Sequence, residues 1–220
     1  NGIDTSTNQT CLHLVKRSPL IKVALGWHPE HVKSEDDVAK ALNEVKHIQR
    51  IAKKEGILAI GEIGLDYFHT KDNATRELQK KVFIAYLSLA ENLRLPVILH
   101  TRNSQKDILA LLEEQKFSQP VILHCFEASE QQIREALKAD HYFTIPASVV
   151  RNKQFSTLLD LVPTSRILTE ADAPYQGPKK GIPSMPKDIA STVKYIAERK
   201  GLDAKEVEHM IYQNYMKLFL

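Results

Sequence analysis

Four side chains that can bind a metal ion follow short apolar runs typical of buried strands. Glu62 comes directly after the run ILAI and glycine, and Asp172 follows ILTEA. The tetrapeptide VILH occurs twice, and its two copies end in His100 and His124. Carboxylates and imidazoles that leave coordination positions open are the ligands with which a divalent ion activates water at neutral pH. These residue types therefore predict a metal centre for hydrolysis, in which a carboxylate can bridge two ions.

Each of these residues also has a plain structural explanation. A histidine at the end of a strand can donate a hydrogen bond to a backbone carbonyl, and Glu62 could pair with a lysine. Four such residues at equivalent strand ends favour the metal-site interpretation over four separate coincidences. Gly61 and Gly64 flank the glutamate and leave room for a highly charged partner beside it.

The spacing of apolar residues predicts strands that alternate with helices. Strands are expected at 21–26, 57–61, 96–100, 120–124, 141–145 and 166–169. Helices are expected at 34–55, 75–92, 104–115, 129–139, 153–161, 186–200 and 204–218. Ser34 can cap the first of these helices, and the three acidic residues that follow it suit the positive end of the helix dipole. A strand followed by a helix, repeated along the chain, indicates a parallel sheet.

A parallel sheet of this kind is either doubly wound or closed into a barrel. In a barrel the carboxyl ends of all strands converge on one face, where such enzymes have their active sites. In an open sheet the four ligands would lie in a row, and only those near a switch point would meet. Because the candidate ligands follow four different strands, we expect an α/β, TIM (β/α)8-type barrel that forms one hydrolase domain over residues 1–220.

Composition excludes several other classes of protein. The chain has 220 residues, 43% hydrophobic and 26% charged, which is typical of a globular domain and not of a disordered or fibrous protein. No apolar run approaches the roughly 18 residues of a membrane span, and no leader is evident, so we expect a cytoplasmic protein without a membrane partner. Two cysteines, Cys11 and Cys125, support neither a disulfide framework nor a thiolate zinc cluster. The net charge of +3 permits an anionic substrate.

Several short motifs resemble, in order along the chain, those of the TatD-type metal-dependent deoxyribonucleases, which are amidohydrolase-like TIM barrels. They are GWHP at 26–29, GEIGLDY at 61–67, LHTR at 99–102, LHCF at 123–126, TEADAPY at 169–175 and NYMKLF at 214–219. The resemblance implies metal-dependent hydrolysis of DNA phosphodiesters, often from a 3′ end. The expected substrate is therefore DNA with single-stranded ends, and the expected activity is that of a 3′-5′ exonuclease.

The resemblance also implies a role for each candidate ligand. Glu62 would bridge two divalent ions, which could be Mg²⁺, Mn²⁺ or Zn²⁺. His100 and His124 would bind one of these ions, and Asp172 would bind the other. The catalytic residues would be Glu62 and Asp172, because the latter would also hold or deprotonate the attacking water.

Other residues of the motifs have supporting roles in this comparison. His28 in GWHP resembles the family's substrate-side histidine, and Arg102 could clamp a phosphate oxygen. Tyr67, Phe68 and Tyr175 follow strands and could stack on bases. The pair of Glu170 and Cys125 could support the ligands, although packing or a backbone hydrogen bond explains these two residues more simply.

The chain departs from the family pattern in two places. Residues 181–186 read GIPSMP where the family has a stretch similar to Arg-Asn-Glu-Pro. The family opens with an Asp-x-His-x-His-like motif, and this sequence contains no His-x-His. Residues 1–5 resemble the end of the second barrel strand, so we expect an N-terminally incomplete chain of about six strands. Strand one, its helix and most of strand two would then be missing.

Two other functions are compatible with the same residues. The ligands of the predicted centre could activate water for attack on an amide, ester or lactone, as in an amidohydrolase. A homologue with a depleted metal site could instead be a non-catalytic binding protein.

Overall fold

The structure, a computed structural model, describes residues 1–220, whose contacts divide the chain into two compact units. Unit 1 is Asn1–Ile122 and unit 2 is Leu123–Leu220. The expectation of one domain over the whole chain stays a prediction. None of the helices combines the length and the apolar character needed to cross a bilayer.

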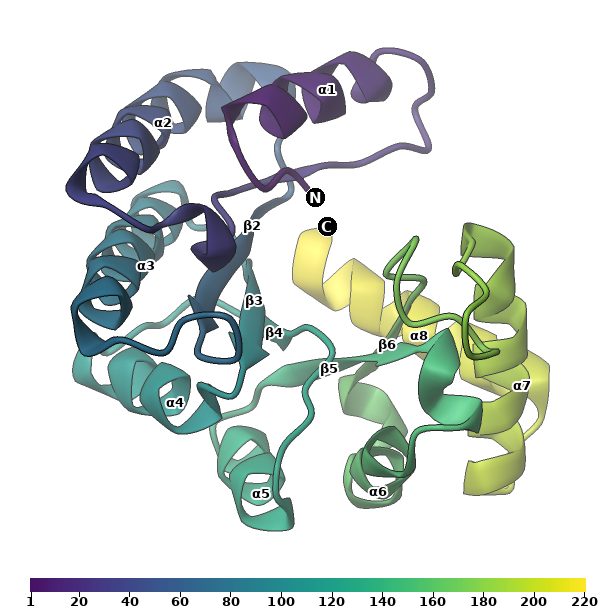
Figure 1. Ribbon diagram of the computed structural model, residues 1–220. Helices are drawn as coiled ribbons and strands as arrows, with labels where there is room; N and C mark the ends of the chain where they lie inside the picture. The colour runs from purple at the N-terminus through teal and green to yellow at the C-terminus, as the bar shows by residue number, and fades with distance from the viewer. The chain divides into compact units, whose positions relative to one another are not determined.

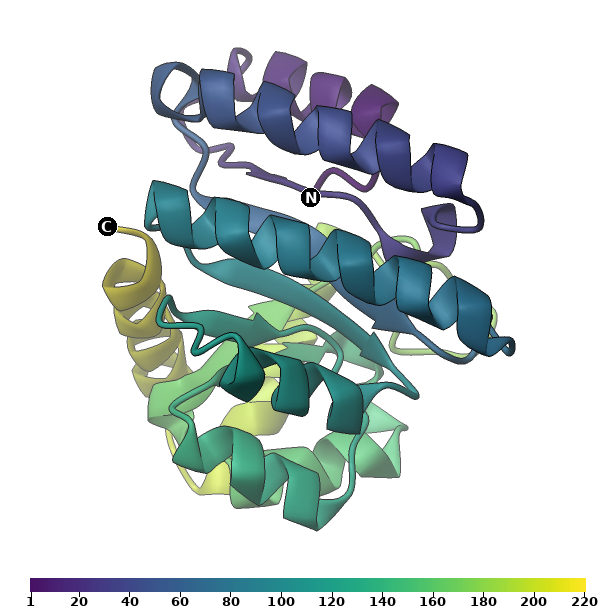
Figure 2. The ribbon, with the colours of Figure 1, turned by 90° about the vertical axis from the view of Figure 1, so that its left-hand side faces the viewer.

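Unit 1 consists of parallel strands and the helices that connect them. Its strands are β1 (Ala24–Leu25), β2 (Ala59–Asp66) and β3 (Val97–Arg102), and β4 (Val121–Leu123) begins at its end. Its helices are α1 (Thr5–Val15), α2 (Glu35–Glu55), α3 (Asn73–Leu93) and α4 (Gln105–Glu114). β2 pairs in parallel with both β1 and β3, and α2 and α3 lie side by side against this part of the sheet (Figures 1 and 2). Every residue of β2 is buried, as expected for a parallel strand covered on both faces.

The two long helices of unit 1 begin and end where the sequence predicts, to within two residues. The Ser34 side chain accepts a hydrogen bond from the Asp37 backbone N–H and caps α2. This helix ends at Gly56, whose φ of 64° is in the left-handed region that favours glycine. Asp72 caps α3 in the same way, by accepting from the Thr75 N–H.

The prediction that residues 1–5 are the end of a strand is wrong for Asp4 and Thr5. Helix α1 already begins at Thr5, because the Asp4 side chain accepts a hydrogen bond from the Thr7 N–H at 2.7 Å. Only the residues before the cap make strand-like contacts, in which the Gly2 N–H donates to the Ala24 carbonyl at 3.0 Å. The helix was missed because its one buried residue is the polar Asn8, so it has no apolar periodicity.

Strand β2 carries a β-bulge beside Glu62. Ile60 pairs with Val97, and Ile63 pairs with Leu99. A step of three residues along β2 therefore matches a step of only two residues along β3. The extra residue lies within 61–62, and such a bulge turns neighbouring side chains away from regular alternation. The bulge therefore sets the direction of the glutamate at this point of the strand.

Gly64 allows β2 to approach β3 closely next to the histidine of the VILH motif. Its φ is 141°, and a Cβ atom added there would lie 2.1 Å from the His100 carbonyl oxygen. Any other residue would push the two strands apart at the ligand. The space left by the missing side chain is therefore filled by the backbone of β3, and Gly64 does not leave room for a charged partner as the sequence suggested.

Unit 2 contains a second pair of parallel strands with helices around it. The strands are β5 (Tyr142–Pro146) and β6 (Ile167–Glu170). The helices are α5 (Glu130–Lys138), α6 (Lys153–Leu161), α7 (Ile189–Lys200) and α8 (Ala204–Phe219). α7 and α8 lie side by side (Figure 1). Asn214 of the NYMKLF motif fixes α8 to β6, because its side-chain amide donates to the Ile167 carbonyl at 2.8 Å.

Candidate metal centre

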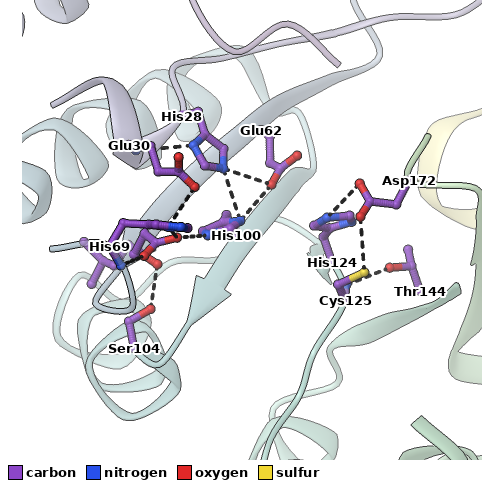
Figure 3. A network of polar contacts seen from close by, with 12 residues as sticks. His28, Glu30, Glu62, His69, His100, Ser104, His124, Cys125, Thr144 and Asp172 are labelled. Atoms are coloured by element: carbon purple, nitrogen blue, oxygen red, sulfur yellow. Dashed lines mark hydrogen bonds and ion pairs between the residues drawn. The ribbon is translucent and has the colours of Figure 1, made fainter. Parts of the chain in front are cut away.

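A first group of polar side chains lies at the carboxyl ends of β2 and β3 in unit 1. This group, the Glu62 cluster, consists of His28, Glu62, Asp66, His69 and His100 (Figure 3). The His100 Nδ1 and Glu62 Oε1 atoms are 3.0 Å apart, and the His28 Nε2 atom is 3.6 Å from the same oxygen. All three side chains are less than 15% exposed. The structure therefore brings together two predicted ligands and the predicted substrate-side histidine.

The other nitrogen of the His100 ring is held by a buried acid. His100 Nε2 donates to Asp66 Oδ2 at 2.9 Å, and the Asp66 side chain is fully buried. Burial raises the pKa of the Asp66 carboxyl, but hydrogen bonds from His100 and His69 outweigh it and hold the pKa well below its ordinary value. Asp66 is therefore an ionised acceptor, and it keeps a proton on His100 Nε2.

The contact between His100 and Glu62 fits a bound cation. With Nε2 protonated, the Nδ1 lone pair of His100 points at a carboxylate oxygen, and two lone-pair atoms at 3.0 Å need a cation between or beside them. Burial lowers the pKa of His100, but hydrogen bonds to Asp66 and Glu62 raise it more, which favours positive charge at this contact. Imidazole nitrogen and carboxylate oxygen are also the donors that a divalent ion takes.

His28 presents a hydrogen-bond donor to the Glu62 cluster. Its Nδ1 atom accepts from the Glu30 backbone N–H at 3.3 Å, which places the ring proton on Nε2. That Nε2 atom lies 3.2 Å from His100 Nδ1. A nitrogen that carries a proton offers no lone pair to a metal ion, so His28 is suited to contact an anion. Its predicted role in substrate binding stays a prediction.

A second group, the His124 cluster, lies in unit 2 after β4, β5 and β6. It consists of His124, Cys125, Thr144, Glu170 and Asp172, and Figure 3 labels all of these except Glu170. His124 Nδ1 is hydrogen-bonded to Glu170, and His124 Nε2 lies 3.6 Å from Asp172 Oδ1. The structure therefore brings the other two predicted ligands together as well.

Glu170 is the buried acceptor of this second cluster. Besides the His124 ring, it accepts from the Cys125 backbone N–H at 3.2 Å and from the Cys125 thiol at 2.9 Å. Burial raises the pKa of the Glu170 carboxyl, but the charge of His124 and these hydrogen bonds outweigh it and lower the pKa. From the sequence, packing or a backbone hydrogen bond was the simpler explanation of Glu170. In the structure its carboxylate also holds the proton on His124 Nδ1.

Cys125 acts as a hydrogen-bond donor in this cluster. Burial, followed by the charge of Glu170, raises the pKa of its thiol well above the ordinary value. The protonated thiol donates to Glu170, and its sulfur lies 3.9 Å from Asp172 Oδ2.

Two residues of the candidate site differ from what the sequence suggested. Asp66 was not recognised as a site residue, although it and Glu62 are the only polar side chains in a strand of apolar residues and glycine, which was a usable signal. Arg102, predicted to clamp a phosphate, lies with its guanidinium carbon 4.0 Å from the centre of the exposed Phe68 ring. Its role towards a substrate stays a prediction.

Known proteins are similar to this chain over nearly all of its length. The family described as TatD related DNase matches residues 1–220. The human protein named deoxyribonuclease TATDN3 is 34% identical over 200 residues, which are 89% of this chain and 73% of that protein. The uncharacterized metal-dependent hydrolase YabD of Bacillus subtilis is 29% identical over 224 residues, which are 99% of this chain and 85% of that protein.

Solved structures support the fold assignment. The TatD homologue YjjV of Escherichia coli superposes with a TM-score of 0.85 at 24% identity, covering 99% of this chain and 84% of that one. This likeness confirms the predicted α/β fold class of the TIM-barrel type, and the six expected strands are present. Together with the family match, it establishes that the chain belongs to the TatD related DNase family and is a metal-dependent hydrolase.

Proposed function

We propose that this hydrolase cleaves phosphodiester bonds of DNA, working from single-stranded 3′ ends in the 3′-5′ direction. The observation that carries the proposal is shared by both clusters: a histidine lies between a buried acid and a second carboxylate. This arrangement keeps one ring nitrogen protonated and leaves the other for a cation. The names of the relatives, deoxyribonuclease and metal-dependent hydrolase, agree with the proposal.

The residues that would hold the metal are the four predicted ligands. In the Glu62 cluster these are His100 through Nδ1 and the Glu62 carboxylate, and in the His124 cluster they are His124 through Nε2 and Asp172. A bound divalent ion would lower the pKa of water and polarise the phosphate. The donor set suits Mg²⁺, Mn²⁺ and Zn²⁺, and we propose that the protein uses two such ions.

The side chains of the chain itself would do the remaining work. Asp172 would accept the proton of the attacking water as a general base. His28 would donate its Nε2 proton to a non-bridging phosphate oxygen, in accordance with the tautomer fixed by the Glu30 N–H. Arg102 would contact a further phosphate oxygen. Asp66 and Glu170 would hold the two histidine rings in place.

The test is chelator-sensitive cleavage of a labelled single strand by the purified chain supplied with each metal in turn. Strands labelled at the 5′ end should give a ladder that shortens from the 3′ end, and duplex with blunt ends should be cleaved more slowly. Amide, ester and lactone substrates run in parallel would reveal an amidohydrolase instead. A chain that binds metal and hydrolyses only these acyl substrates would overturn the proposed DNA substrate.

The location and partners of the protein are part of the same proposal. A nuclease of this kind is proposed to act in the cytoplasm on DNA, without a membrane partner. Fractionation of cells that express a tagged chain would test the location.

A further inference from the structure

We propose that Phe68 and Arg102 form a nucleotide-binding subsite in unit 1, where an unpaired base stacks on Phe68 and its phosphate contacts Arg102. The subsite rests on the proposed function, because it supposes a DNA strand at the Glu62 cluster. It adds a physical reason for the single-strand preference of that function.

The subsite lies immediately beyond the Glu62 cluster, at the carboxyl ends of β2 and β3. Arg102 follows His100 by two residues, so both side chains are on the same face of β3. This face becomes more exposed along the strand, from the half-buried His100 to the exposed Arg102. The Tyr67 N–H donates to the Arg102 carbonyl at 2.9 Å and brings Phe68 beside the end of β3.

Phe68 presents an open aromatic surface with cations around it. Phe68 is 45% exposed, so part of its ring is accessible to a ligand. The Arg102 guanidinium carbon is 4.0 Å from the ring centre, and the Lys71 Nζ atom is 5.2 Å from it. An unpaired base stacks on an aromatic or guanidinium plane, and its phosphate binds a cation. Phe68 offers the plane, and Arg102 and Lys71 offer the cations, at one place.

The loop that carries Phe68 is fixed by residues of the candidate metal centre. Asp66, which holds the His100 ring, also accepts a hydrogen bond from the His69 backbone N–H at 2.7 Å. The neighbouring Tyr67 is turned away, since its hydroxyl donates to Asp107 at 2.8 Å. Because the loop is ordered before any ligand arrives, binding costs less conformational entropy.

A stacking site of this kind distinguishes single strands from duplexes. In a duplex the bases are already paired and stacked, so a base must be unstacked before it can contact Phe68. An end that is already single-stranded needs no such step. The alternative is that the contact of Arg102 with Phe68 only stabilises the loop, as exposed cation–π pairs do by about 0.5–1 kcal/mol.

Binding without cleavage separates these two possibilities. The probe is a fluorescein-labelled oligothymidylate in EDTA, and the readout is fluorescence anisotropy. Phe68→Leu should weaken binding about 10-fold, whereas Phe68→Trp should retain it, because a ring remains for stacking. Tyr212→Leu removes another exposed aromatic ring, on α8, and serves as the matched control with unchanged affinity. Circular dichroism checks that each variant is folded.

Two further measurements assign the separate roles of the ring and the cation. Walking one abasic nucleotide along the strand should find a position at which Phe68→Leu no longer weakens binding, because there is no base to stack. Arg102→Gln should reduce the slope of log Kd against log salt by about 0.7, as expected for one lost phosphate contact with a single strand. Arg134→Gln, on α5, is the control for the loss of an exposed arginine and should leave the slope unchanged.

The outcomes distinguish the subsite from the function on which it rests. Equal affinity of the wild type and Phe68→Leu, or no binding by the wild type, would overturn the subsite. A loss of affinity that persists at every abasic position would show a structural effect only and would also overturn it. Binding that depends on Phe68, without cleavage in any of the three metals, would support the subsite and overturn the proposed nuclease activity.

Discussion

The Glu62 cluster and the His124 cluster each hold a histidine between two carboxylates, but they use opposite nitrogens of the ring. His100 contacts its buried acid, Asp66, through Nε2 and turns Nδ1 to Glu62. His124 contacts its buried acid through Nδ1 and turns Nε2 to the predicted ligand. The protonated ring nitrogen is therefore Nε2 in His100 and Nδ1 in His124, and the other nitrogen of each ring has the lone pair.

This difference follows the order of the acids along the chain. In unit 1 the predicted ligand Glu62 comes before the buried acid Asp66, and both belong to β2. In unit 2 the buried acid Glu170 ends β6, and the predicted ligand Asp172 follows it. Each pair of acids comes from one continuous segment, and the two pairs run in opposite orders along the chain.

The largest expected effect comes from removing either predicted ligand carboxylate. Glu62→Ala and Asp172→Ala should each reduce metal-dependent hydrolysis by several orders of magnitude, because the group that activates water is lost. Glu62 lies within β2 and Asp172 follows β6, and neither is part of the apolar core, so circular dichroism should show a folded protein. Glu114→Ala, which removes an exposed carboxylate at the end of α4, is the control. A folded Asp172→Ala protein with undiminished activity would contradict the role given to the His124 cluster.

A smaller effect is expected from the two buried acids. Asp66→Asn and Glu170→Gln keep the shape of the side chain but remove the charge that fixes the ring proton. Each should lower metal affinity or activity by about 10- to 100-fold, as is usual for partners of metal-binding histidines. Calorimetric titration with Zn²⁺ measures the affinity. If only one of the two variants lost affinity, the equivalence of the clusters would be wrong.

Acid should destabilise unit 2 through a histidine outside its cluster. Burial lowers the pKa of His141 to about 4, so the folded state resists protonation. The stability that this histidine contributes is complete above its unfolded pKa of about 6.5 and is lost as pH falls towards 4. The free energy of unfolding should drop by about 2 kcal/mol between pH 7 and pH 5, and His141→Gln should flatten this dependence. Urea denaturation at several pH values measures it, and an equal dependence in the variant would contradict the assignment.

The smallest effect should come from the thiol of the His124 cluster. Cys125→Ser keeps a donor for Glu170 and should retain metal affinity. Cys125→Ala removes one hydrogen bond, which is worth about 1 kcal/mol, and should lower Zn²⁺ affinity by less than 10-fold. A complete loss of metal in the alanine variant, measured by elemental analysis, would mean that the sulfur is itself a ligand.

The sequence was sufficient to predict the regular elements and the ligand pairs. Strand ends are marked by apolar runs that stop at a polar residue, and helix starts by caps such as Ser34. The four candidate ligands stood out in the sequence because each lies within or just after an apolar strand, and their role as ligands stays a prediction. The helix that begins at Thr5 was not predictable in this way, since it packs through a polar residue.

The partners of the histidines were harder to predict than the histidines themselves. Asp66 lies in the same motif as Glu62, but the sequence does not say which of the two acids faces the other ring nitrogen. That choice depends on the β-bulge and on the close approach of the strands at Gly64, which are properties of the backbone. The contact of Arg102 with Phe68 likewise depends on the course of the loop after β2.

The ring protons of the two histidines test the central claim most directly. In ¹⁵N-labelled protein loaded with Zn²⁺, long-range ¹H–¹⁵N correlation spectra identify which nitrogen of each ring carries a proton and which binds metal. We expect a proton on Nε2 and metal on Nδ1 for His100, and a proton on Nδ1 and metal on Nε2 for His124, with Asp66→Asn disturbing only the former. The same tautomer in both rings, or metal on the nitrogen that faces Asp66 or Glu170, would contradict the account.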